Sequence, residues 1–306
     1  MKIFPLKIIP DDAKIDFVSM DKISYTISIL LLLLSLLSIC IYKLNFGIDF
    51  MGGVNIDMSS NSKIELHILR KKLTSMDIGE INIQHYGNEN DISLKISDNA
   101  KIDMSKNIDK IKDVFNKDFS DYNLQIKKVD FVGPQVGKTL IFSGIKAICL
   151  AFVAIMVYVW IRFEWQFGVG AIVSLIHDVV ISLGFMSISG LDFNQASIAA
   201  ILTVIGYSVN DSVVIYDKVR ENMAKYHNKT TKDIINMSIN QTLPRTTLTV
   251  ITTLIANLAL ILFGGEAIKS FSLLVFVGIL LGTYSSIYVS ASILIPLGIN
   301  KKRKKI

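Results

Sequence analysis

Stretches almost free of charged side chains constrain this chain more than any other feature of its sequence. The clearest covers residues 23–42 and contains five consecutive leucines, Leu30 to Leu34. A stretch of about 18 or more apolar residues is typical of a helix that crosses a membrane. Five further stretches resemble it, at 141–161, 166–188, 195–216, 246–264 and 271–297. The sequence therefore predicts a polytopic α-helical membrane protein with six transmembrane helices.

Composition supports this interpretation and argues against a soluble enzyme. Of the 306 residues, 51% are hydrophobic and 19% are charged. Soluble domains carry about 25% charged residues, so the apolar excess needs a surrounding other than water. The net charge of +6 is a poor sign of nucleic-acid binding, because Lys and Arg gather beside apolar stretches, as at 301–305. We expect no nucleic-acid partner.

The basic residues also predict the orientation of the chain, since cytoplasmic loops are enriched in Lys and Arg. The tail 1–22 carries four Lys and the loop 217–245 carries both Lys and Arg, whereas the connection 189–194 has neither. We therefore expect a multi-pass protein of the cell inner (cytoplasmic) membrane with both termini in the cytoplasm, including the basic tail 301–306. The first apolar stretch is too long for a cleaved signal peptide, and we expect it to remain as an anchor.

One large segment, 43–138, is then expected outside the cytoplasm, ahead of a membrane domain over 139–300. Its pattern predicts strands at 46–59, 78–86, 92–97 and 124–132, and helices at 63–76 and 104–119. The order β-α-β-β-α-β is typical of an α+β ferredoxin-like domain. Whether this domain is a spacer or binds a partner stays open. We expect a short surface helix in the cytoplasmic stretch 217–244.

Two features that resemble chemical sites have simpler explanations. Cys40 and Cys149 lie inside predicted spans and have no metal-type spacing, so we expect neither a metal site nor a cofactor. The segment 133–139 resembles a phosphate-binding loop, but only three residues separate its first glycine from the Gly-Lys pair. That motif needs four, and a turn entering the second span explains the segment better.

Polar side chains inside the spans are the candidates for function, because an ionised group near the bilayer centre costs about 3 kcal/mol. They are His177 and Asp178 in the third span, Asn210 and Asp211 in the fourth, and Arg245 and Thr249 at the start of the fifth. A cytoplasmic loop joins the fourth and fifth spans, so Asp211 and Arg245 are predicted to pair. Protonation of Asp211 would then release Arg245, which is how a proton-driven switch works. The alternatives are a structural ion pair at Asp211 and a histidine that only hydrogen-bonds a neighbouring helix.

Several segments resemble the SecF proteins, members of the SecD/SecF family within the resistance–nodulation–division (RND) superfamily. They are Phe46–Gly53, Val132–Gly137, His177–Val179, Ala200–Val214 and Gln241–Thr246. They cover nearly the whole chain in the expected order, and the Gly-Tyr-Ser-x-Asn-Asp run that begins at Gly206 is the most specific. Pro244 is a modest departure, and proline suits the first turn of a helix.

The resemblance implies a subunit that works with SecD and the SecY/SecE/SecG channel. It would use protons to drive preproteins outward. The family's important membrane Asp and Arg correspond to Asp211 and Arg245, which are the implied coupling pair. The polar residues inside the spans add Asn210 as a coupling candidate, with Asp178, His177 and Thr249 as secondary candidates. The implied structural motif residues are Asp49, Gly52, Gly53, Gly133 and Gly206.

Three other functions are alternatives to a SecF-type subunit. One half of a proton-coupled RND-type exporter of small molecules would share the membrane core, but such proteins usually duplicate it. An intramembrane enzyme built on His177 and Asp178 lacks a recognisable catalytic context, so we expect no enzymatic activity. In a purely structural scaffold, Asp211 and Arg245 would only lock helices together.

Overall fold

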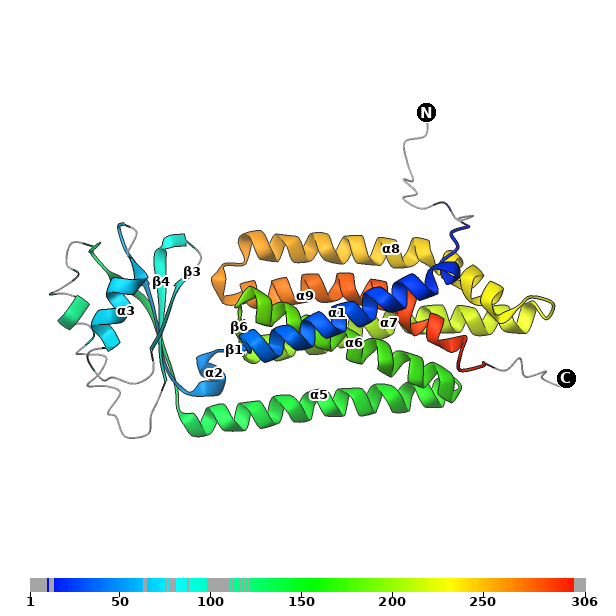
Figure 1. The fold of residues 1–306 in the computed structure, drawn as a ribbon, viewed down its shortest axis with the longest axis horizontal. Coiled ribbons are helices and arrows are strands. Elements are labelled where there is room, and N and C mark those ends of the chain that lie inside the picture. The colour runs from blue at the N-terminus through cyan, green and yellow to red at the C-terminus, as the bar shows by residue number, and fades with distance from the viewer. Residues whose placement is uncertain are drawn as a thin grey trace, which may run out of the picture. The chain divides into compact units, whose positions relative to one another are not determined.

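The computed structural model in Figure 1 describes residues 10, 14–62, 65–74, 76, 81–86, 88–97, 111, 113–115, 117, 119 and 122–299. The chain divides into two compact units. We call the first the helical unit; it comprises Met1–Asn45, Ala147–Leu191 and Ala196–Ile306. We call the second the sheet unit; it comprises Phe46–Lys146 and Asp192–Gln195.

Six helices of the described chain are long and apolar enough to cross a membrane, which confirms the predicted number of spans. They are α1 (Asp21–Tyr42), α5 (Pro134–Arg162), α6 (Trp165–Ser189), α7 (Gln195–Lys225), α8 (Thr231–Phe263) and α9 (Glu266–Ser285). A short 3-10 turn, Val18–Met20, precedes α1. A π-helical turn (Ser286–Ser290) and a 3-10 turn (Ser292–Leu294) follow α9.

The predicted short surface helix at 217–244 is wrong. Helix α7 continues to Lys225, and α8 begins at Thr231 and passes through Pro244 without a break. A polar stretch does not stop a helix, whereas a capping box does start one. Here the Thr230 side chain accepts a hydrogen bond from the Asp233 backbone, and the Asp233 side chain accepts one from the Thr230 backbone.

Small residues bring the helices of the helical unit close together. The buried residues of α1 are all serines, Ser24, Ser28, Ser35 and Ser38, and α1 packs against α6. A methyl group added at Gly184 of α6 would lie 2.4 Å from the Ser35 Cβ. At Gly278 of α9 it would lie 2.2 Å from a Val204 methyl carbon. Membrane helices pack through small residues because lipid is as apolar as the helices themselves.

The sheet unit is built on a four-stranded antiparallel sheet with the order β3-β4-β2-β5. Its strands are β2 (Gly53–Ser59), β3 (Ile81–Tyr86), β4 (Asn88–Ser97) and β5 (Gln125–Val132). Alternate apolar residues of β2 and β4 pack against helix α3 (Leu66–Thr74). Most of the predicted helix 104–119 lies outside the described residues, but Ile111, Phe115 and Phe119 belong to this core.

The predicted first strand, 46–59, is wrong in its first half. It comprises the end of a two-residue strand, β1 (Asn45–Phe46), then a helical turn, α2 (Ile48–Met51), and only then β2. Gly52 and Gly53 separate α2 from β2, with φ angles of 72° and 123°. Glycine adopts such angles without steric cost, which explains why the chain turns at this point.

Candidate functional site

Two carboxylates are buried in helices that can cross a membrane. Asp178 of α6 is 0% exposed and Asp211 of α7 is 3% exposed. A buried charge is costly unless other groups hydrogen-bond it or it changes its protonation state. The surroundings of these two residues therefore indicate what each can do.

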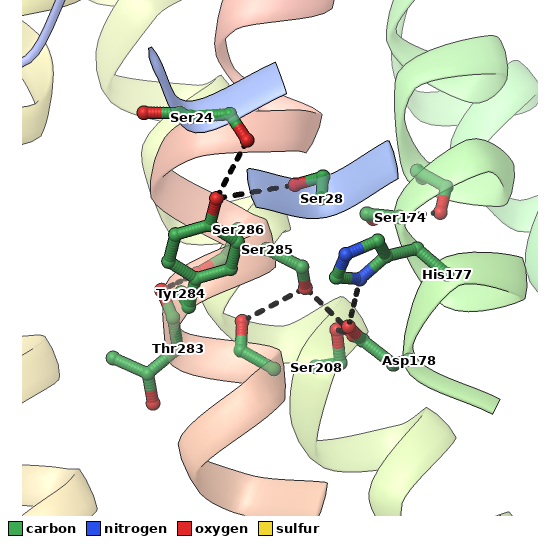
Figure 2. Close-up of polar contacts among 12 residues, drawn as sticks. Ser24, Ser28, Ser174, His177, Asp178, Ser208, Thr283, Tyr284, Ser285 and Ser286 are labelled. Carbon is green, nitrogen blue, oxygen red and sulfur yellow. Dashed lines mark hydrogen bonds and ion pairs between the residues drawn. The ribbon is translucent and has the colours of Figure 1, made fainter. Parts of the chain in front are cut away.

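Asp178 is surrounded by hydrogen-bonding groups from three helices (Figure 2). Its Oδ2 accepts from the Ser208 hydroxyl of α7 at 2.6 Å and from the Ser285 hydroxyl of α9 at 2.7 Å. Its Oδ1 lies 3.0 Å from Nδ1 of His177. All four side chains are buried. Hydrogen bonds to an ionised group contribute about 1.5–3 kcal/mol each, so this environment suits a carboxylate.

His177 continues this network toward α1. Its ring stacks on Tyr284 of α9 at a centroid distance of 6.2 Å and an angle of 29°. The Tyr284 hydroxyl donates to the Ser24 backbone oxygen at 2.8 Å and lies 3.1 Å from the Ser28 hydroxyl, as Figure 2 shows. The second ring nitrogen of His177, Nε2, is buried and has no hydrogen-bond partner among the described residues. The network therefore joins α1, α6, α7 and α9.

Asp211 has a different environment. Its Oδ2 is buried without a hydrogen-bond partner among the described residues, and the same holds for the hydroxyl of Ser212 beside it. Arg245, which is exposed, lies close enough to act on the Asp211 carboxylate through its charge. No direct ion pair between the two appears within the part of the chain that the structure describes. The Asp211–Arg245 pair thus stays a prediction.

The two remaining sequence candidates near Asp211, Asn210 and Thr249, do not share its buried environment. Asn210 is exposed on α7. The Thr249 hydroxyl donates to the Arg245 backbone oxygen, one turn earlier in α8, at 2.9 Å. That bond stays within the helix, so the structure gives Thr249 no bridging role between helices.

Among the motif residues, Asp49 and Gly52–Gly53 have clear structural roles in the sheet unit. The Asp49 carboxylate accepts a hydrogen bond from the backbone N–H of Gln195 at 3.1 Å, at the first residue of α7. A carboxylate in that position satisfies an N–H that has no partner inside the helix. Gly52 and Gly53 form the turn before β2.

Gly137, rather than Gly133, is the tightly packed glycine at the start of α5. A methyl group at Gly133 would meet no atom within 4 Å, whereas one at Gly137 would lie 2.6 Å from the Phe50 backbone oxygen. A methyl group at Gly206 of α7 would also meet nothing within 4 Å, and Gly206 is exposed. The segment that resembles a phosphate loop therefore opens a helix and packs against backbone.

Sequence reasoning missed Ser208, Tyr284 and Ser285 as members of the Asp178 network. Serine is frequent in these spans and is buried at many positions, so its presence alone did not distinguish them. Across the described residues, no group of three or more His, Cys, Asp or Glu side chains is arranged to hold a metal ion.

Comparison with known proteins agrees with the motifs. Residues 110–300 match the family model described as the C-terminal part of the protein export membrane proteins SecD and SecF. The chain is 53% identical over its whole length to the protein translocase subunit SecF of Rickettsia bellii, all of which it covers. It is 54% identical to the same subunit of Rickettsia prowazekii, over 100% of this chain and 98% of that protein.

A solved structure has the same fold. The crystal structure of SecDF from Thermus thermophilus, described as a translocon-associated membrane protein, matches with a TM-score of 0.86 and 32% identity. The match covers 96% of this chain but only 40% of that chain. Together with the full-length relatives, it shows that the chain belongs to the SecF subunits of the SecD/SecF family of protein-export membrane proteins.

Proposed function

We propose that this chain is the SecF subunit of a Sec protein-export translocase and couples the proton-motive force to preprotein movement. The observation that carries the coupling is Asp211, a buried carboxylate in a membrane helix with one oxygen lacking a partner and Arg245 within electrostatic reach. Burying an unpaired charge is costly, which favours a change of protonation state at such a carboxyl group. One charge crossing about 100 mV of membrane potential releases about 2.3 kcal/mol, enough to bias a two-state element.

The chain would act together with SecD. This chain matches 40% of the single chain in the SecDF structure, and the remaining 60% of that chain has no counterpart here. Moreover, α7 exposes Thr203, Gly206 and Asn210 on one side. These are small or polar groups in a helix long and apolar enough to cross a membrane. Small and polar residues are typical of contacts between membrane helices. Their exposure supports a membrane partner on this side of α7.

The sheet unit would be the extracytoplasmic, ferredoxin-like domain, and both termini would be cytoplasmic. The strand order β3-β4-β2-β5 with all pairs antiparallel supports that fold. The basic residues around the cytoplasmic loop and tails support the orientation. In this arrangement the translocase would also contact the SecY/SecE/SecG channel and the emerging preprotein.

The test compares Asp211→Asn and Arg245→Met with the wild type, each assembled with its SecD partner in inverted vesicles. Completion of preprotein transport is followed with and without a proton gradient. We expect both variants to assemble normally and to lose only the gradient-dependent component. Thr252→Ala is the matched control, since the Thr252 hydroxyl bonds only to the backbone oxygens of Leu248 and Thr249 within α8. Normal assembly with unchanged transport would show that Asp211 and Arg245 are structural.

A further inference from the structure

We propose that Nε2 of His177 is a second proton-accepting site within the membrane helices. Asp178 accepts a hydrogen bond from Nδ1 of His177 and so leaves the lone pair of Nε2 free. This inference rests on the proposed function, because it adds a group to the same proton-coupled machine. It is carried by the geometry of the Asp178 network and by the unpartnered nitrogen of His177 (Figure 2).

The hydrogen bonds of Asp178 determine which nitrogen of His177 carries the proton. Two hydroxyls, from Ser208 and Ser285, are placed to donate to Oδ2, so the carboxyl group acts as an acceptor. The Ser285 hydroxyl also lies 3.2 Å from the Gly282 backbone oxygen, but its contact with Asp178 is shorter, at 2.7 Å. With the Asp178 carboxyl group ionised, as this set of donors favours, Nδ1 of His177, 3.0 Å from Oδ1, is the donor. A neutral imidazole has one N–H, so Nε2 is left with a free lone pair.

That lone pair is buried and unsatisfied. His177 is 3% exposed, and no described group donates to Nε2. Leaving a buried polar atom without a partner costs about 1–3 kcal/mol. A histidine with a purely structural role would be expected to use both nitrogens. An orphaned basic nitrogen beside an acceptor carboxylate is instead the arrangement found where a proton is taken up.

The surrounding charges favour this uptake. Helix α6 packs against α1, α9 and the turns after α9, and it meets α7 through Ser208. Within residues 23–42, 165–189, 195–216 and 270–294, the only charged side chains are Asp178 and Asp211, and both are acidic. The titratable groups nearest the imidazole on α9 and its following turn are Tyr284 and Tyr288, whose rings are 5.2 Å apart. A proton on Nε2 would turn a buried net negative charge into a neutral His–Asp pair.

The site is also placed to act on helix packing. Tyr284 stacks on the imidazole and is hydrogen-bonded to α1 through Ser24 and Ser28. Ser208 precedes Asp211 by three residues on α7, a rise of about 4.5 Å. A change of charge at His177 therefore reaches both the α1–α9 contact and the helix that carries Asp211.

The tautomer can be measured directly. The chain has four histidines, and His67, His85 and His227 are exposed. With these three replaced by Asn, the full chain with ¹⁵N-labelled histidine is reconstituted in lipid bilayers with its unlabelled partner and studied by solid-state NMR. We expect an Nδ1–H tautomer at high pH that converts to imidazolium as the pH is lowered. An Nε2–H tautomer at high pH, or an imidazole that stays neutral at every pH at which the chain remains folded, would overturn the inference.

Two variants separate positioning from structure. Asp178→Asn should abolish the conversion, whereas Ser285→Ala removes one donor to Oδ2 and should keep the Nδ1–H tautomer. If Asp178→Asn does not assemble, the wild-type spectrum alone decides. In the vesicle assay, His177→Gln should flatten the pH dependence of gradient-driven transport. An unchanged pH profile would overturn the inference and leave Asp211 standing, whereas unchanged transport in Asp211→Asn would overturn the proposed function.

Discussion

Replacing Gly184 by alanine should separate α1 from α6. The added methyl carbon would lie 2.4 Å from the Ser35 Cβ and 2.7 Å from the Ser35 Cα. Because one of these atoms is backbone, rotating a side chain cannot relieve the clash. Carbon atoms pack at about 3.5 Å or more, so α1 must move by about 1 Å.

The expected cost follows from these contacts. Overpacking costs about 1–3 kcal/mol, while alanine gains up to about 1 kcal/mol over glycine in a helix. The movement would also stretch the bond from the Ser187 hydroxyl to the Ser38 backbone oxygen, now 2.9 Å. Such bonds in membrane proteins contribute about 0.6 kcal/mol each. We expect a net loss of about 1–2 kcal/mol in the free energy of unfolding.

The assay is equilibrium unfolding of the purified chain in mixed lipid–detergent micelles. Gly168→Ala is the matched control, because it lies on the same helix and its added methyl would meet nothing within 4 Å. The double variant Ser35→Gly with Gly184→Ala should recover part of the loss, since it removes the Ser35 side chain but leaves its Cα. Equal stability of the Gly184→Ala and Gly168→Ala variants would refute the packing argument.

Two further predictions concern the other glycines. Gly137→Ala should lower the thermal midpoint of the sheet unit, because its methyl would lie 2.6 Å from the Phe50 backbone oxygen, whereas Gly133→Ala should leave the midpoint unchanged. Equal midpoints in thermal unfolding would contradict this assignment. Gly206→Leu should weaken co-purification with SecD without destabilising the chain alone, because Gly206 is exposed and its added methyl would meet nothing in this chain. The control is Ala154→Leu on the exposed side of α5, and equal recovery of SecD with both variants would argue against a partner at Gly206.

Local pattern predicted the four strands and the first helix of the sheet unit well, except where a turn depends on single residues. The alternating apolar residues of β2 and β4 indicated strands that the structure contains. The helical turn α2 inside the predicted first strand depends on two positive φ angles at Gly52 and Gly53. Sequence alone marked these glycines but not the turn they make.

The loop between α6 and α7 shows how a contact distant in sequence escapes prediction. Residues 189–194 were notable only for lacking basic side chains. In the structure, the Asp192 carboxylate pairs with Lys95 of β4, and Phe193 packs against Phe46 and Phe50. These partners are about 100 or more positions away along the chain, so no local pattern reveals them.

The sequence by itself determined the number of membrane spans and the positions of the charges within them. A helix that crosses a membrane needs about 20 predominantly apolar residues, and such stretches, with the few polar residues inside them, are visible in any single sequence. The family could be recognised from the sequence for the same reason, since its motifs are continuous segments.

Only the tertiary structure decided what those polar residues touch. Serines are common at contacts between membrane helices, so the sequence does not show which serines face Asp178. Ser285 lies 107 positions from it in the chain and 2.7 Å from it in space. The hydrogen bonds of Asp178, and with them the free nitrogen of His177, arise from the packing of α6, α7 and α9.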